Sequence, residues 1–102
     1  MSEITIERVN ASEGVKFKVI GRITAITEAN FDKMLADALE EGFYNIVLNM
    51  QDVTLLTSVG IKIILKTFKN CLDAGGKFRI EDPSDVVKNV MGLSALQQMM
   101  VD

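Results

Sequence analysis

The chain has 102 residues, a size typical of one domain, and its 48% hydrophobic and 25% charged residues match an ordinary globular protein. Its formal net charge of −3 argues against nucleic-acid binding, because proteins that neutralise a phosphate backbone carry a basic balance or stripe. No apolar run approaches the roughly 20 residues that span a bilayer, and the N-terminus lacks the pattern of a signal peptide. We expect one cytoplasmic domain over residues 1–102, without membrane insertion.

Histidine is absent, which excludes Ser-His-Asp and Cys-His catalytic pairs and histidine-based metal sites. The carboxylates that remain do not form a persuasive alternative: Asp32, Asp37, Glu40 and Glu41 share one predicted helix with Lys33, as on the solvated face of an amphipathic helix. The sequence therefore predicts a protein that is not an enzyme and that needs neither a metal nor a cofactor.

Two strands are predicted first. Apolar residues alternate with polar ones at Ile4 and Ile6 and again at Val15, Phe17 and Val19. The short link Asn10–Gly14 between them indicates a hairpin, and Gly21 closes the second strand. From Thr27 to Glu41 the spacing becomes helical, and Gly42 ends that helix.

The continuous apolar run Tyr44–Met50 predicts a strand that is covered on both faces. A second helix follows from about Ser58 to Leu72, with a core stripe of Ile61, Ile64, Leu65, Phe68 and Leu72 and with Cys71 at the edge of that stripe. Then come a short strand at Lys77–Ile80, turn and capping residues at Asp82–Ser84, a helix carrying Val87, Val90 and Met91, and a last short helix from Ser94 to Met100.

The predicted order is ββαβαβαα, which implies an α/β domain with a mixed four-stranded sheet and about four helices. Function in such domains gathers where strands end and helices begin. Here these places are Gly21–Thr27 and Asp52–Gly60.

One segment, Asn49–Ile61, combines a buried strand, a polar loop and a Thr-Ser pair that opens a helix. Thr57 or Ser58 can serve there as an N-cap, with a hydroxyl oxygen accepting a hydrogen bond from a free backbone N–H of the first turn. The other interpretation is that one of the two hydroxyls carries function.

The segment resembles the STAS domain, the fold of bacterial anti-sigma factor antagonists, in which a strand and a loop with an aspartate lead into Asp-Ser-Ser-Gly-Leu or a variant. Here the matching stretches are Ile46–Val53 and Thr57–Ile61. The resemblance extends over essentially the whole chain: Gly21–Ile23 is similar to the family's Gly-x-Ile/Leu strand end, Ala74–Phe78 to its helix-Gly-Gly-strand join, and Val90–Leu96 to its closing helix.

The resemblance implies that Ser58 is the serine that an anti-sigma factor kinase phosphorylates, with Thr57 as the alternative, and that Asp52 is an acidic residue of the adjoining loop. The chain departs from the family pattern twice. Thr57 stands where many members have aspartate, and Thr24 stands where many have an acidic residue. Both changes make the site less acidic.

Helical geometry suggests how a partner would dock. If Ile61 marks the centre of the buried stripe, Val59 and Ile63 form a small exposed apolar spot beside Ser58, flanked by Lys62 and Lys66. We expect this spot and the Gly21–Thr27 loop, including Arg22 and Thr24, to bind the partner. The alternative is that a neighbouring helix covers Ile63 and that the lysines are only a solvated face.

By resemblance, the expected function is that of an anti-anti-sigma factor. The unphosphorylated protein binds an anti-sigma factor with serine kinase activity and frees the sigma factor, phosphorylation releases the protein, and a PP2C-type phosphatase resets the cycle. The alternative is a STAS scaffold subunit of a stress-signalling complex or of a lipid-transport ABC complex.

Overall fold

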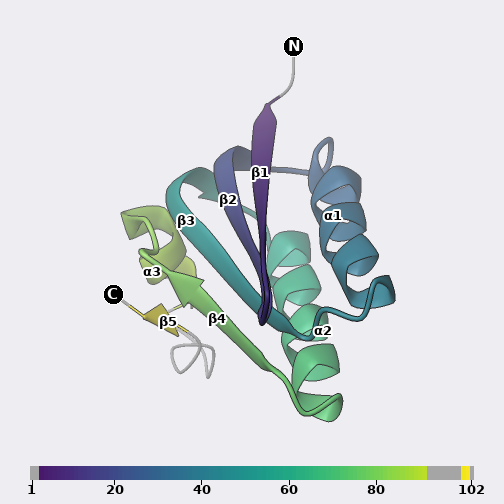
Figure 1. Cartoon of the computed structure of the whole chain (residues 1–102). Coiled ribbons are helices and arrows are strands. Elements are labelled where there is room, and N and C mark those ends of the chain that lie inside the picture. The colour runs from purple at the N-terminus through teal and green to yellow at the C-terminus, as the bar shows by residue number, and fades with distance from the viewer. Residues whose placement is uncertain (1–2, 92–99, 102) are drawn as a thin grey trace.

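The computed structural model describes residues 3–91 and 100–101. In chain order the elements are β1 (Ile4–Ala11), β2 (Gly14–Ile23), α1 (Glu28–Glu40), β3 (Asn45–Leu56), α2 (Ser58–Asp73), β4 (Lys77–Glu81), α3 (Asp85–Met91) and β5 (Met100–Val101). Figure 1 shows one twisted sheet with α1 and α2 packed side by side on one of its faces. The protein is the α/β domain that the sequence predicts.

The sheet has the strand order β1-β2-β3-β4-β5. β1 and β2 pair antiparallel, whereas β2, β3, β4 and β5 pair in parallel, so the predicted mixed four-stranded sheet is confirmed and gains a two-residue strand at one edge. That strand, β5, is absent from the sequence prediction. The helix predicted from Ser94 to Met100 lies largely outside the described residues, and Met100 pairs with Ile80 in the sheet.

The second strand extends two residues past the glycine that was predicted to close it. Gly21 has a φ of 111°, and a Cβ there would lie 2.3 Å from the carbonyl oxygen of Glu3, the residue just before β1. Glycine lets the backbone adopt this conformation and approach β1 closely, so β2 continues to Ile23 through an irregularity in its pairing with β3.

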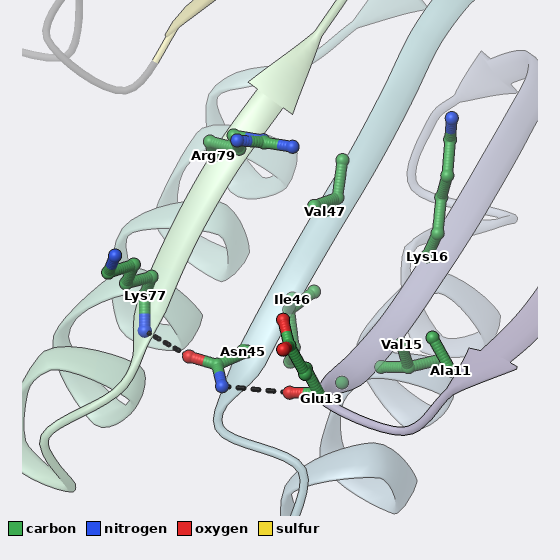
Figure 2. Close-up of a pocket in the computed structure, with 10 residues that line it drawn as sticks. Ala11, Glu13, Val15, Lys16, Asn45, Ile46, Val47, Lys77 and Arg79 are labelled. Atoms are coloured by element: carbon green, nitrogen blue, oxygen red, sulfur yellow. Dashed lines mark hydrogen bonds between the residues drawn. The ribbon is translucent and has the colours of Figure 1, made fainter.

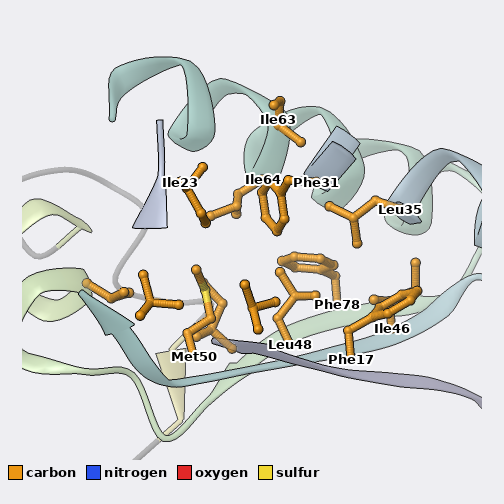
Figure 3. Close-up of a cluster of buried hydrophobic side chains, with 14 of the residues drawn as sticks. Phe17, Ile23, Phe31, Leu35, Ile46, Leu48, Met50, Ile63, Ile64 and Phe78 are labelled. Atoms are coloured by element: carbon orange, nitrogen blue, oxygen red, sulfur yellow. The ribbon is translucent and has the colours of Figure 1, made fainter. Parts of the chain in front are cut away.

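The core lies between the sheet and the helices α1 and α2 (Figure 3). Phe17 and Leu48 rise from the sheet, and Phe31, Leu35 and Ile64 descend from the two helices; each is at most 1% exposed. Full burial of a side chain of this size contributes about 1.5–3 kcal/mol relative to leaving it in water. This shared core fixes the helices on the sheet.

The buried side of α2 matches the predicted stripe only in part: Ile64 is fully buried, and Ile61 and Phe68 are partly buried against the core. The structure buries Gly60, Ile63, Ile64, Thr67 and Cys71, and leaves Leu65 and Leu72 40% and 49% exposed. The buried side is therefore rotated by about 100°, the turn of one residue. Gly60 allows the start of the helix to lie close to the sheet. The buried hydroxyl of Thr67 is satisfied because it donates to the carbonyl oxygen of Ile63 at 2.9 Å.

The third strand is longer than predicted and runs to Leu56. Beyond its pairing with β4, its carbonyl groups bind Ser84 instead: the Ser84 amide donates to the Met50 oxygen at 3.2 Å, and the Ser84 hydroxyl donates to the Val53 oxygen at 2.6 Å. Ser84 Oγ also accepts from the Val87 amide at the start of α3, as the predicted capping chemistry requires. These bonds keep β3 extended up to the helix that follows.

Candidate partner-binding face at the start of helix α2

Parallel pairing of β2 and β3 brings the two connections that follow these strands to the same end of the sheet. Ile23 at the end of β2 lies opposite Leu56 at the end of β3, so the turn into α1 and the start of α2 are neighbours. A Cβ on Gly60 would lie 2.7 Å from Leu56 Cδ1 and 2.9 Å from Ile23 Cγ2. Glycine therefore allows the first turn of α2 to rest directly on both strand ends.

Thr57 and Ser58 have different roles at this helix start. Thr57 is the N-cap residue, with an extended backbone, and its Oγ1 accepts a hydrogen bond of 3.3 Å from the Gly60 amide. Ser58 is the first helical residue and its side chain is exposed. The capping interpretation is thus confirmed for Thr57, and the Ser58 hydroxyl takes no part in it.

The turn from β2 to α1 is held by its own threonines. Thr27 is buried, and its hydroxyl donates to the Arg22 carbonyl oxygen at 2.7 Å and accepts from the Thr24 amide at 2.9 Å. The Thr24 hydroxyl accepts from the Ile26 amide at 3.1 Å. The turn is therefore fixed from within, and it presents Ile26 to solvent with 81% of its surface exposed.

Two further residues predicted to contact a partner, Gly21 and Arg22, also make contacts within the fold. Gly21 approaches β1 through its backbone, and its carbonyl oxygen accepts from Thr54 Oγ1 at 3.3 Å. The Arg22 amide donates to the Glu3 carbonyl oxygen at 2.9 Å, while the exposed guanidinium lies 3.8 Å from the Glu3 carboxylate. Arg22 and the turn that contains Thr24 remain accessible to a partner.

The prediction that Asp52 belongs to a polar loop is wrong. Asp52 is part of β3, where it lies opposite Ile20, and its carboxylate is 3.6 Å from Lys18 Nζ. Strand alternation directs Asp52 away from the buried Val53, toward the sheet face opposite the helices. About 13 Å of strand separates Asp52 from the end of β3 at Leu56. Thr57 is the one residue between β3 and α2.

The predicted apolar spot on α2 is half right. Val59 is 40% exposed, whereas Ile63 is only 7% exposed and belongs to the core. Ile63 is buried because α1 packs against this side of α2, where Asp32 of α1 also pairs with Lys66 of α2. The alternative that a neighbouring helix covers Ile63 is confirmed, so this residue is withdrawn from the candidate face.

The two predicted lysines differ in their contacts. Lys66 Nζ lies 2.8 Å from Asp32 Oδ1, so its charge is already compensated. Lys62 is exposed, has no ion pair among the described residues, and stands one helical turn after Ser58 on the same side of α2. The first turn of α2 contains no acidic residue, so the surroundings of Ser58 favour negative charge.

Sequence reasoning missed two exposed apolar residues at this edge. Leu55, the last residue but one of β3, is 36% exposed, and Ile26 projects from the turn before α1. Val59 lies one turn before Ile63 on the side of α2 that faces α1, toward this turn. The signal available in the sequence was an isoleucine placed between two turn-forming threonines. Because Leu55 alternates with the buried Leu56, it points to the sheet side away from the helices, so we refer to Ile26, Ser58, Val59 and Lys62 as the Ser58 face.

The described residues show neither a metal site nor a membrane-spanning segment. No group of three or more cysteine, aspartate or glutamate side chains is arranged to hold a metal ion in the part of the chain that the structure describes. Within the same residues, no helix has the length and hydropathy needed to cross a membrane.

Solved structures with the same fold include anti-sigma factor antagonists. The anti-sigma factor antagonist SpoIIAA in its unphosphorylated form aligns with a TM-score of 0.85 at 17% identity, covering 96% of this chain and 87% of that one. An antagonist from Mycobacterium paratuberculosis gives 0.83 at 20% identity, covering 95% and 82%. The phosphorylated form of the Bacillus cell fate determinant SpoIIAA gives 0.79 at 19% identity, covering 97% and 89%.

The mixed sheet, the two helices on one face and the glycine-supported start of α2 define the SpoIIAA-like class of α/β domain. The family model of the STAS domain matches residues 5–101, so the chain belongs to the STAS domain family. A comparison with curated proteins finds no significant match.

Proposed function

We propose that this protein is an anti-anti-sigma factor, which binds an anti-sigma factor through the Ser58 face and is released when a serine kinase phosphorylates Ser58. One observation carries the proposal: Ser58 is exposed at the start of α2 while the adjacent Thr57 supplies the helix cap. The hydroxyl that would receive phosphate is therefore not needed to hold the helix. The protein acts as a substrate and a binding partner, not as an enzyme.

The fold can accept a phosphate at Ser58 without rearrangement. Phosphorylation adds about −1.5 to −2 charges and three acceptor oxygens. The positive end of the helix dipole and the ammonium group of Lys62, one turn further on, both favour this charge. The scaffold therefore stays folded in both states.

The same charge would weaken the binding of a partner that covers the Ser58 face. Ile26 and Val59 offer the partner apolar contacts, and a phosphate covered by the partner would have to lose its hydration shell on binding. Without a cation on the partner, that cost weakens the complex. A coupling of about 1–3 kcal/mol, or 5- to 150-fold in affinity, is ordinary for such control.

Ser58 is the better candidate of the two hydroxyls. Thr57 Oγ1 already accepts from the Gly60 amide and is only partly exposed, so modifying it would disturb the cap. Ser58 has neither constraint. The absence of the aspartate that many family members carry before the serine makes the site less acidic, which fits a kinase that selects the fold and the exposed hydroxyl rather than local negative charge.

The test uses the purified protein, ATP and each serine-kinase anti-sigma factor encoded in the same genome. We expect one kinase to add a single phosphate, located at Ser58 by peptide mass spectrometry, and Ser58→Ala to remove it. A PP2C-type phosphatase from the same genome should reverse the modification. Phosphate at neither Ser58 nor Thr57 with any of these kinases would contradict the switch.

Binding to the kinase is measured by calorimetry with a variant that mimics the charge. Ser58→Glu should weaken binding by 5- to 150-fold, whereas Ser58→Ala should bind like the parent. Ser12→Glu is the matched control, because Ser12 is an exposed serine in the β1–β2 turn at the opposite edge of the sheet. Equal affinities for Ser58→Glu and Ser12→Glu would sink the proposal.

The alternative roles keep the fold and change the partner. A STAS scaffold of a stress-signalling complex would co-purify in a large assembly, and a subunit of a lipid-transport ABC complex would co-purify with membrane components. Affinity purification from cells, combined with phosphosite mapping, separates these roles from the proposed one. A stable membrane complex without phosphate at Ser58 or Thr57 would favour the transporter role. For the proposed role we expect the protein in the cytoplasm, where sigma factors act.

A further inference from the structure

A hollow of about 470 Å³ opens on the sheet face that points away from α1 and α2. Figure 2 shows its walls: the β1–β2 turn, the start of β3 and the strand β4. Parallel pairing places these segments at the edge of the sheet opposite Ser58. The hollow falls within the size range of small-molecule sites and lies apart from the Ser58 face.

Hydrogen bonds fix the shape of this hollow. Asn45 Nδ2 donates to the Glu13 carbonyl oxygen at 2.8 Å, and Asn45 Oδ1 accepts from the Lys77 amide at 3.0 Å (Figure 2). One side chain thereby ties together three segments that are distant in sequence. A Cβ on Gly14 would lie 2.1 Å from the Asn45 carbonyl oxygen, so the turn also rests directly on β3. A ligand would meet a preformed site.

The lining is cationic in a chain whose net charge is −3. The lining contains Lys16, Lys77 and Arg79 and one carboxylate, that of Glu13. Lys16 Nζ is already paired with Glu81 beside the hollow. Neither the Lys77 ammonium nor the Arg79 guanidinium forms an ion pair within the described residues, although Lys16 and Asn49, helped by the charge of Arg79, lower the pKa of the nearby Glu81 carboxyl. Both stand on the same face of β4, about 7 Å apart along the strand, as residues i and i+2.

We propose that this hollow binds a small hydroxylated organic phosphate. The planar guanidinium of Arg79 presents paired donors that match phosphate oxygens, and Lys77 adds a second cation for the dianion. The Glu13 carboxylate accepts hydrogen bonds from hydroxyl groups, and Val47 provides apolar contact for the carbon skeleton. The space exceeds what an inorganic phosphate ion would fill, and its three walls suit a compact molecule.

The test is a titration of the ¹⁵N-labelled full chain with glucose 6-phosphate, followed by NMR. We expect saturable shifts at the backbone amides of Asn45, Val47, Lys77 and Arg79, with a dissociation constant below about 1 mM. Glucose should produce no saturable shift, and inorganic phosphate should bind at least fivefold more weakly. Equal affinity for inorganic phosphate would reduce the site to a bare anion contact and overturn the proposal. The proposal would also fail if glucose 6-phosphate did not saturate the shifts at a concentration about 20 times the expected dissociation constant.

Variants assign the binding to the proposed residues. Arg79→Gln should weaken binding about tenfold or more and Lys77→Gln by a smaller factor, consistent with loss of charge-assisted hydrogen bonds. Lys69→Gln on α2 removes the same charge elsewhere and should leave binding unchanged. Both β4 side chains are exposed, so the variants should keep the parent spectrum outside the site. Equal weakening by all three variants would show non-specific attraction and reject the site.

The inference is independent of the proposed signalling role. Ser58→Glu, which should disturb partner binding, should leave the glucose 6-phosphate titration unchanged because Ser58 lies at the other edge of the sheet. Failure of one proposal therefore does not decide the other.

Discussion

Lys66 of α2 and Asp32 of α1 form an ion pair, with 2.8 Å between Nζ and Oδ1, that joins the two helices on the sheet. It marks the side of α2 that α1 covers, the same side on which Ile63 enters the core. The lysines that the sequence groups into one docking surface therefore divide: Lys66 belongs to the contact between helices, and Lys62 remains available to a partner.

Reversing these two charges should have different effects on stability. Lys66→Glu removes the ion pair and places a carboxylate beside Asp32, so the free energy of unfolding should fall by about 0.5–1 kcal/mol more than in Lys62→Glu. Urea unfolding measures the difference, and Asp32→Lys combined with Lys66→Glu should restore part of it. In the kinase-binding assay, Lys62→Glu is expected to weaken the complex. Unchanged affinity in Lys62→Glu would remove Lys62 from the Ser58 face.

The neighbouring hydroxyls at the start of α2 should contribute unequally to stability. Thr57→Ala removes the acceptor for the Gly60 amide and should cost about 1 kcal/mol, whereas Thr57→Ser keeps the acceptor. Ser58→Ala removes an exposed hydroxyl with no capping role and should change stability by less than about 0.5 kcal/mol. Chemical denaturation of the three variants measures this order. A larger loss in Ser58→Ala than in Thr57→Ala would show that Ser58 supports the helix.

The rotation of α2 makes a second pair of substitutions informative. Ile63→Ala deletes a side chain that is 7% exposed and should lower the free energy of unfolding by about 2–4 kcal/mol. Val59→Ala, at a position that is 40% exposed, should cost less than about 1 kcal/mol and should weaken partner binding instead. Denaturation and calorimetry on these two variants distinguish a residue that stabilises the core from a residue that contacts the partner. An equally small loss in both variants would mean that Val59 and Ile63 both lie outside the buried stripe, as the sequence predicts.

Burial raises the pKa of the Cys71 thiol from 9.0 to about 11. Native protein should therefore react slowly with thiol reagents at pH 8, and protein unfolded in urea should react rapidly. Since the unfolded thiol ionises at lower pH than the native one, its contribution to stability is complete below pH 9 and declines as the pH rises toward 11.

Comparison with Cys71→Ala isolates that contribution. The alanine variant has no thiol to titrate, so the stability advantage of the parent over it should shrink between pH 9 and pH 11. Urea denaturation at several pH values provides the measurement. A constant difference across this range would mean that Cys71 ionises equally in both states.

The sequence by itself determined the elements from β1 to α3 and their order, because each depends on spacing along the chain. Alternation at Phe17 and Val19 and helical spacing from Phe31 to Leu39 are local patterns, and the hairpin and βαβ connections then leave few topologies. The position of Ser58 at a helix start follows from the same patterns. These predictions did not depend on which residues of other segments pack against each side chain.

Only the tertiary structure decided which surfaces are covered. Ile63 is buried because α1 packs there, and Asp52 is in a strand because Ile20 and Ser84 hold β3 extended on both of its edges. The exposure of Ile26 depends on a turn closed by Thr24 and Thr27. Burial and strand pairing depend on two segments in contact. The spacing of residues within one segment does not show which other segment packs against it.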